Sequence, residues 1–136
     1  MNRVFADTSY WIALLNPRDE LHGKALAVSK IHSTDRIVTS QMVLTELLNS
    51  FADRGSQLRI AVARAVEALL ANRNVTIITQ TSNQFESALR RYQAAPDKGW
   101  SLTDCASFSI MEAEAIREAL TYDRHFEQAG FQAILR

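Results

Sequence analysis

The chain has 136 residues, 47% of them hydrophobic and 22% charged, with 15 basic and 15 acidic side chains and a formal net charge of zero. This length and hydrophobic content suit one compact domain with a real core, so we expect a single domain over residues 1–136. The balanced charge argues against a protein that coats nucleic acid by bulk electrostatics, so any contact with nucleic acid must be local.

The first half of the chain predicts two short strands and four helices. Asn16-Pro17 stops the first helix, because proline cannot continue it. Ser40 is a candidate N-cap for the third helix, and Gly55 ends that helix. The predicted elements are a strand at Val4–Ala6, helices at Thr8–Leu15 and Glu20–His32, a strand at Ile37–Thr39, and helices within Gln41–Ala52 and at Leu58–Leu70.

The second half continues the alternation of strands and helices. Its clearest strand is β-branched throughout, Val-Thr-Ile-Ile. The predicted elements are a strand at Val75–Ile78, helices at Asn83–Ala95 and Thr103–Ala113, a weak strand around Ala119–Thr121, a short helix after Asp123, and a last strand at Phe131–Leu135. Strands separated by helices imply a mostly parallel sheet covered on both faces. We therefore expect a three-layer α/β/α sandwich with a central sheet of four to five strands.

The lack of a recognisable targeting signal and the single cysteine lead us to expect a cytoplasmic protein. The single cysteine, Cys105, excludes an internal disulfide and a multi-cysteine zinc site, and it suggests a reducing compartment. The apolar stretch before Asp7 is too short for a signal peptide. No run approaches the roughly 18 apolar residues of a membrane span, so we expect no membrane association.

Four acidic residues stand where this fold places functional side chains. Asp7 and Asp123 each follow a predicted strand, Asp104 begins a helix, and Glu46 lies about two turns into a helix that follows a strand. Ligands bind such sheets beyond the carboxyl ends of the strands. Four like charges in one small volume repel unless a cation neutralises them. The sequence therefore predicts a divalent-metal site, and oxygen ligands favour Mg²⁺ or Mn²⁺.

Each of these acids also has an ordinary structural explanation. Asp7 and Asp123 are suitable N-caps for the helices that follow them, and Ser101-x-x-Asp104 matches a capping box. Capping does not explain Glu46, which lies in an otherwise apolar stretch, although a glutamate on a helix is usually just solvated. From these residues alone, caps and a metal site remain about equally supported for each aspartate.

Several other residues are weaker candidates for function. His22, His32 and His125 lack metal-ligand spacing, and His125 is as consistent with a surface position as with substrate contact. Trp100 is equally suited to stacking on a base and to anchoring its loop in the core. The remaining assignments are Cys105 as a buried core residue and Arg64, Arg90 and Arg91 as solvated helix positions.

Four motifs resemble the PIN domain family, and within it the VapC-type toxins of toxin–antitoxin pairs. The motifs are Phe5-Ala6-Asp7-Thr8-Ser9, Thr45-Glu46, Lys98-Gly99-Trp100-Ser101-Leu102-Thr103-Asp104-Cys105 and Leu120-Thr121-Tyr122-Asp123-Arg124-His125-Phe126. The last two are long and the first two short, and together they extend over essentially the whole chain. The segment before Asp123, Ala115–Leu120, departs from the apolar strand of the family, which puts the start of that strand in doubt.

The resemblance implies a metal-dependent endoribonuclease whose site consists of Asp7, Glu46, Asp104 and Asp123. It implies supporting roles for Ser9 and Thr121, whose hydroxyls hold the geometry or bind phosphate. It also implies RNA as the substrate, a small antitoxin protein as the partner, and a homodimer.

The coordination chemistry of magnesium suggests which of these residues bind the ion directly. Magnesium keeps several waters and takes few protein ligands, so we assign Asp7 and Asp104 as direct ligands. Glu46 and Asp123 then bind through water, hold a second ion about 3.5–4 Å away, or position the attacking water. For substrate we expect a single-stranded or looped RNA. The candidates for binding its phosphates are Lys98, Arg124 and His125.

Alternatives from other classes remain. A PIN nuclease in RNA processing would need no antitoxin. A phosphoryl-accepting regulatory domain would pair its acids near the first strand and carry a lysine after a late strand, where this chain has Asp123. A non-catalytic interaction module would typically have lost site acids, and all four are present.

Overall fold

Five parallel strands form the sheet of the computed structural model, which describes residues 2–136, in the order β3-β2-β1-β4-β5. The strands are β1 at Arg3–Ala6, β2 at Arg36–Ser40, β3 at Val75–Ile78, β4 at Glu118–Leu120 and β5 at Gln132–Ala133. The α/β sandwich predicted from the sequence is confirmed, with an all-parallel sheet.

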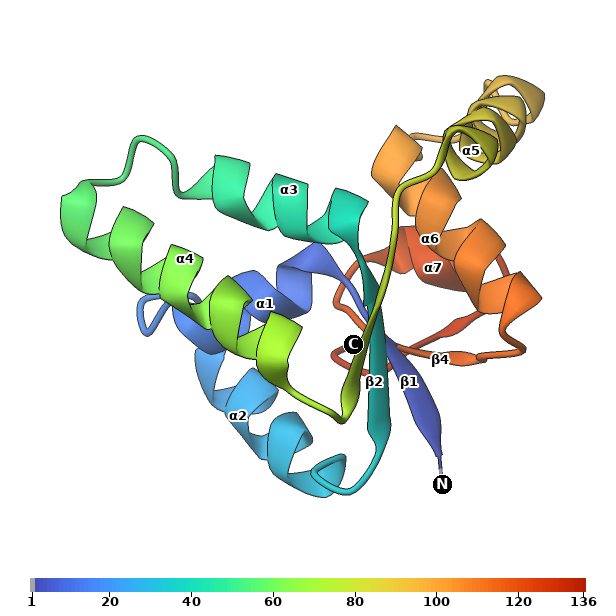
Figure 1. Ribbon diagram of the computed structural model, residues 1–136. Helices are drawn as coiled ribbons and strands as arrows, with labels where there is room; N and C mark the ends of the chain where they lie inside the picture. The colour runs from blue at the N-terminus through green and yellow to red at the C-terminus, as the bar shows by residue number, and fades with distance from the viewer. Residues whose placement is uncertain (1) are drawn as a thin grey trace.

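Seven helices cover the two faces of this sheet in the described part of the chain. They are α1 at Thr8–Leu15, α2 at His22–Ile31, α3 at Gln41–Ser50, α4 at Ser56–Ala71, α5 at Ser82–Ala94, α6 at Leu102–Ala113 and α7 at Arg124–Gln128. Figure 1 shows α1 to α4 on one side of the sheet and α5 to α7 on the other. Within residues 2–136, no helix is both long and apolar enough to span a membrane.

The central position of β1 follows from its sequence. Val4, Phe5 and Ala6 are all fully buried, as expected for a strand covered on both faces. Ala6 lies opposite Leu120 of β4, and the amide of Asp7 donates a hydrogen bond to the Leu120 carbonyl at 3.1 Å. The residues that follow β1 and β4 are therefore neighbours at the carboxyl edge of the sheet.

Side-chain caps begin the helices that leave this edge. Ser40 accepts a hydrogen bond from the amide of Val43 at 3.1 Å, which starts α3 directly after β2. Ser101 and Asp104 form a capping box at the start of α6. Such caps satisfy amides that have no partner within the helix, so the sequence determines where each helix leaves the sheet.

Several predicted elements differ from the structure by one or two residues at an end, and two differences have a clear structural cause. The last strand is shorter than Phe131–Leu135, because the amide of Phe131 donates to the carbonyl of Phe126 at 2.9 Å and closes α7 instead of extending the sheet. Helix α3 ends at Ser50, before Gly55, and Gly55 instead precedes α4 with a φ of 93°, a conformation that glycine adopts without steric cost.

Aromatic side chains fill the core beneath α6 and α7. Phe108 is fully buried and packs edge-on against Phe126 and Trp100, with ring centroids 5.0 and 5.1 Å apart. Its ring also stacks on Phe131 at 5.8 Å. One residue of α6 thus joins α7, the chain before β5 and the loop that precedes α6.

Phe108→Ala should lower the free energy of unfolding by about 3–5 kcal/mol, because it leaves a cavity beneath both helices. Urea denaturation monitored by circular dichroism would measure the loss. Phe85→Ala on α5 is the matched control, since Phe85 is 41% exposed and its loss should stay near or below about 1 kcal/mol. Equal losses in the two variants would contradict this description of the core.

Candidate functional site

Asp7 is a buried acid held by hydroxyl groups. It occupies the N-cap position of α1, but its carboxylate makes no capping hydrogen bond, so the capping interpretation is wrong for this residue. The Thr121 hydroxyl donates to Oδ2 of Asp7 at 2.9 Å, and the Ser9 hydroxyl lies 3.4 Å from the same oxygen. Asp7 is 4% exposed and Thr121 fully buried. The carboxylate is therefore oriented by the hydroxyl groups of Thr121 and Ser9.

Thr121 connects Asp7 to Asp123. Its hydroxyl donates to Asp7 and accepts a hydrogen bond from the backbone amide of Asp123 at 3.0 Å. The Ser9 hydroxyl lies 3.1 Å from it and accepts from the amide of Tyr122 at 3.3 Å. The two hydroxyls thus bridge the turns that follow β1 and β4.

Asp104 does cap its helix and remains available for other contacts. Its Oδ2 accepts from the backbone amide of Ser101 at 3.0 Å, while its own amide donates to the Ser101 hydroxyl at 3.0 Å. The same Oδ2 lies 3.1 Å from Nδ1 of His125. The side chain is buried, at 7% exposure. Capping and a functional role are therefore compatible for Asp104.

Asp123 also caps its helix, and it shares His125 with Asp104. Its Oδ1 accepts from the amide of His125 at 2.9 Å and lies 3.2 Å from Nδ1 of that histidine. Asp104, Asp123 and His125 each offer a ligand atom within 4.8 Å of the others, a grouping that could hold a metal ion. Within residues 2–136, Asp7 and Glu46 lie outside this closest group.

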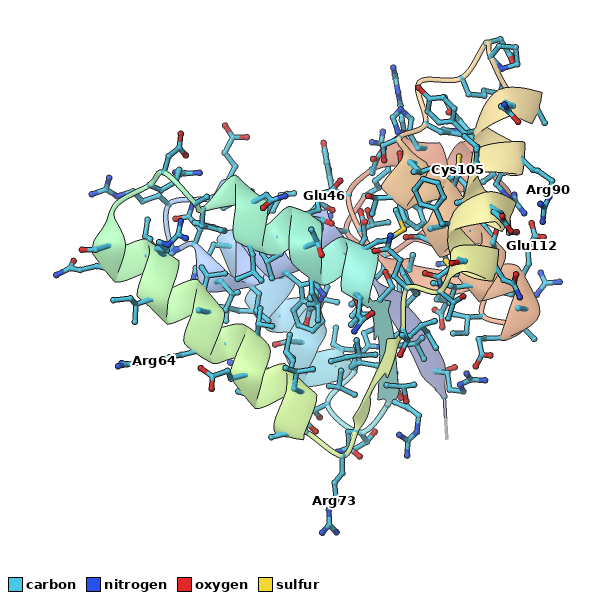
Figure 2. The ribbon with its side chains drawn as sticks, turned by 45° about the horizontal axis from the view of Figure 1, so that its top comes forward. Glu46, Arg64, Arg73, Arg90, Cys105 and Glu112 are labelled. Atoms are coloured by element: carbon cyan, nitrogen blue, oxygen red, sulfur yellow. The ribbon has the colours of Figure 1, made fainter. Side chains whose placement is uncertain are left out.

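Glu46 lies at the margin of the site. It is half-buried on α3 and lines a cavity of about 300 Å³ together with Gln80 and Thr103. Figure 2 shows Glu46 on α3 and, on the neighbouring helix α6, Cys105, which follows Asp104 in the chain. The charge of Glu46 raises the pKa of Asp7, so the fold brings it within electrostatic reach of the other acids.

The electrostatics of this edge oppose ionisation of the buried acids. Burial raises the pKa of Asp7 from 3.8 to about 7, with further increases from the charges of Asp104 and Glu46, while the hydrogen bond from Thr121 lowers it. Burial also raises the pKa of Asp104, as does the charge of Asp123. Among the described residues, no lysine or arginine forms an ion pair with any of these four acids.

The donor set fits a hard divalent cation. Asp7 and Asp104 each use only Oδ2 in side-chain hydrogen bonds, and Asp123 uses only Oδ1. Within residues 2–136, each of these carboxylates is thus held by side-chain hydrogen bonds through one oxygen, and the other oxygen makes none. Free carboxylate oxygens suit Mg²⁺ or Mn²⁺.

The structure shows what His125 and Trp100 contact. His125 lacks metal-ligand spacing in the sequence, but in space it contacts the carboxylates of Asp104 and Asp123. Only its position two residues after Asp123 could have signalled this. Its ring also lies against Gly99, where an added Cβ would be 3.6 Å from Nε2. Trp100 donates its indole N–H to Gln128 at 3.1 Å and packs on Phe108, which identifies it as an anchor of its loop.

The remaining predicted residues are mostly at the surface. Lys98 is exposed and pairs with Asp97 at 3.5 Å. Arg124 is exposed beside Asp123 and forms no ion pair within the described chain. Figure 2 shows Arg64 and Arg90 pointing outward, as predicted. Arg91 differs, because its guanidinium bonds to Glu112 at 2.5 Å. Cys105 is buried, as predicted.

The chain is similar to known proteins over nearly its whole length. The family model of the PIN domain matches residues 4–132. Two curated relatives, each named 23S rRNA-specific endonuclease VapC20, come from Mycobacterium tuberculosis strains CDC 1551 and H37Rv; each is 33% identical over 130 residues, covering 94% of this chain and 95% of theirs. The crystal structure of Mycobacterium tuberculosis VapC20, described as a Sarcin-Ricin loop cleaving toxin, superposes with a TM-score of 0.81. The two chains are 31% identical, and the superposition covers 94% of this chain and 95% of that one.

The raised pKa of Asp7 predicts a pH-dependent stability in the absence of metal. The folded state binds the Asp7 proton more tightly than the unfolded state does. The contribution of Asp7 to the free energy of unfolding is therefore greatest below pH 3.8 and falls as the pH rises toward 7. Each pKa unit corresponds to about 1.4 kcal/mol, and the expected loss is a few kcal/mol. Asp7→Asn should remove this part of the slope.

Urea denaturation between pH 4.5 and 7.5 with a chelator present would measure the effect. Asp53→Asn is the matched control, because Asp53 is exposed and forms no ion pair among residues 2–136. The same slope in wild type and Asp7→Asn would show that Asp7 is not the buried, repelled carboxylate described above.

Proposed function

The chain belongs to the PIN domain family and is an endoribonuclease of the toxin type, and on that premise we propose that the four acids at the carboxyl edge of its sheet form the catalytic site. The observation that carries this proposal is the burial of Asp7 beside Asp104, with no lysine or arginine among the described residues paired to either acid. A divalent ion would relieve that repulsion. PIN nucleases generally depend on divalent metals, and we propose Mg²⁺ or Mn²⁺ for this chain.

Asp7 and Asp104 are the proposed direct ligands, because they are the two most buried of the acids. Asp123 and Glu46, which are more exposed, act directly or through water. Ser9 and Thr121 hold Asp7 in place, while Ser101 and His125 hold Asp104. When bound, the ion would lower the pKa of a water molecule and offset charge on the phosphoryl oxygens.

The substrate we propose is a looped segment of ribosomal RNA. The names of the relatives specify 23S rRNA and the sarcin–ricin loop, and a looped RNA offers splayed bases and exposed phosphates. The zero net charge favours local contacts over a broad basic surface. Arg124 and Lys98 are the candidate phosphate contacts, since both are exposed and close in sequence to Asp123 and Asp104. His125 is less suited to this role because two carboxylates already contact it.

The proposed partner is a small antitoxin protein that inserts a segment near the acids and blocks the site. This proposal rests on the toxin relatives. We also propose a homodimer, from the family resemblance alone. The proposed location is the cytoplasm, which the single cysteine, Cys105, suggests.

Asp7→Asn and Asp104→Asn should each reduce RNA cleavage to below about 1% of wild type. Loss of a residue that only supports a metal ligand typically costs about 10–100-fold, and loss of a ligand should cost more. Cleavage sites and rates would be mapped on total RNA with Mg²⁺ or Mn²⁺.

Two controls accompany this measurement. Asp53→Asn should cleave like wild type, and a chelator should abolish cleavage by wild type until Mg²⁺ or Mn²⁺ is restored. Full activity of either site variant, or full activity in the chelator, would overturn the assignment of a metal-dependent acidic site.

Coexpression should reveal the antitoxin. Wild type expressed alone in its native host should arrest growth, and the small protein encoded beside it should relieve the arrest and copurify with it. Asp7→Asn should not arrest growth but should still copurify with that protein, because a conservative substitution leaves the surface unchanged. Harmless expression of an active wild-type enzyme would favour the RNA-processing alternative.

A further inference from the structure

We propose that Tyr122 is a stacking platform for one RNA base beside the acidic site. This proposal rests on the proposed function and adds to it a residue that selects the substrate. Trp100 was the sequence candidate for this role, but its indole is engaged with Gln128 and Phe108. Within residues 2–136, the large aromatic side chains classed as exposed are Phe85, Tyr92 and Tyr122. Phe85 and Tyr92 belong to α5, which contributes none of the site residues.

Tyr122 stands between two residues of the site. Thr121 holds Asp7 and Asp123 follows, so the backbone at Tyr122 is part of the network around the acids. Its amide donates to the Ser9 hydroxyl at 3.3 Å, and that hydroxyl lies 3.4 Å from Oδ2 of Asp7. The side chain is nevertheless 46% exposed. A large aromatic ring is thus attached to the rim of the site.

The ring flanks the acids and does not line the site. Thr121 and Asp123 both direct polar atoms into the hydrogen-bond network. The Tyr122 ring lies instead against the guanidinium of Arg136, which pairs with Glu127. A ring in that position cannot crowd an ion or the reacting phosphate. It is suited to a nucleotide next to the one that is cut.

Arg136 holds this ring in place. Its guanidinium carbon lies 5.1 Å from the Tyr122 ring centroid, its Nη1 donates to the Tyr122 carbonyl at 3.2 Å, and its Nε pairs with Glu127 at 3.0 Å. A cation over one ring face is a favourable contact. Because the ring is already ordered, a base that stacks on the free part pays less conformational entropy.

The chemistry favours a base over a protein segment as the occupant. Bases stack on aromatic side chains in RNA-binding proteins, and the position beside the acids is where a cleaved strand must pass. The chain also lacks the excess positive charge that could hold RNA without such contacts. A protein partner on this ring is the alternative that the experiment must separate.

The test compares wild type, Tyr122→Leu and Tyr122→Phe on a hairpin RNA pool with a randomised loop, in Mg²⁺. Tyr122→Leu should raise KM roughly 5-fold or more, change kcat less than KM, and lose a base preference at one position next to the cut. Tyr122→Phe keeps the ring and should retain that preference. Tyr92→Leu is the matched control and should match wild type, because Tyr92 lies on α5 and is 51% exposed.

Dissociation constants for the same pool, measured with the chelator present, give a readout independent of cleavage. Loss of affinity in Tyr122→Leu and its recovery in Tyr122→Phe would support the platform. Wild-type affinity and base preference in Tyr122→Leu would overturn the stacking platform. The platform would also be overturned if Tyr122→Leu lost only its copurifying protein partner. If wild type binds the pool with this ring dependence but cuts no RNA in any metal, the proposed function fails while the base contact stands.

Thermal melting checks that Tyr122→Leu is folded. If it is not, Arg136→Gln supplies the same test, because it removes the cation that orders the ring and leaves the ring itself. A smaller rise in KM and the same shift in base preference are expected from Arg136→Gln, and unchanged values would count against the platform.

Discussion

Repulsion between buried carboxylates is the constraint on which the rest of this site depends. Asp7 and Asp104 are almost completely buried, burial and the charges of neighbouring acids raise the pKa of both, and no lysine or arginine among the described residues pairs with them. A folded chain keeps such an arrangement only where other interactions over-determine it. Here those interactions are the parallel sheet, which brings the ends of β1 and β4 together, and the hydroxyl bridge of Ser9 and Thr121.

The helix caps contribute to this arrangement. Capping and metal binding looked like competing explanations for Asp104 and Asp123, yet both residues cap their helices in the structure. A cap uses one oxygen of the carboxylate and orients the other. Ser101 and Asp104 start α6 through the capping box, and the contact of Asp104 with His125 joins α6 to α7. The same contacts fix Oδ2 of Asp104 and leave its other oxygen for a ligand. Stability and function share these hydrogen bonds, which ties the position of each acid to the start of a helix.

A nuclease without net charge must recognise RNA through few contacts. A strongly basic protein binds nucleic acid of any sequence and shape through its phosphates, whereas this chain has equal numbers of basic and acidic residues. The acids themselves repel phosphate until a cation is bound. We propose that binding depends on the ion, on a few cations such as Arg124, and on any base contact close to the cut. On this proposal, the loops after β4 and before α6 influence substrate choice more than the rest of the surface.

The sequence by itself determined the architecture and singled out the four acids of the proposed site. Alternating strands and helices, the β-branched run at Val75–Ile78 and the caps at Ser40 and Ser101 are local signals, and the corresponding elements appear within a few residues of their predicted bounds. The positions of Asp7 and Asp123 at strand ends follow from the same periodicity, because parallel strands end at one edge.

Only the tertiary structure decided what each side chain contacts. Whether Asp7 caps a helix depends on Thr121, more than 100 residues away in the chain, and the placement of His125 between two carboxylates depends on how α7 packs against α6. The anchoring of Trp100 requires Gln128 and Phe108, and the Tyr122 ring lies against Arg136. These contacts join segments distant in sequence, and no local pattern encodes them, because they depend on packing and on strand register.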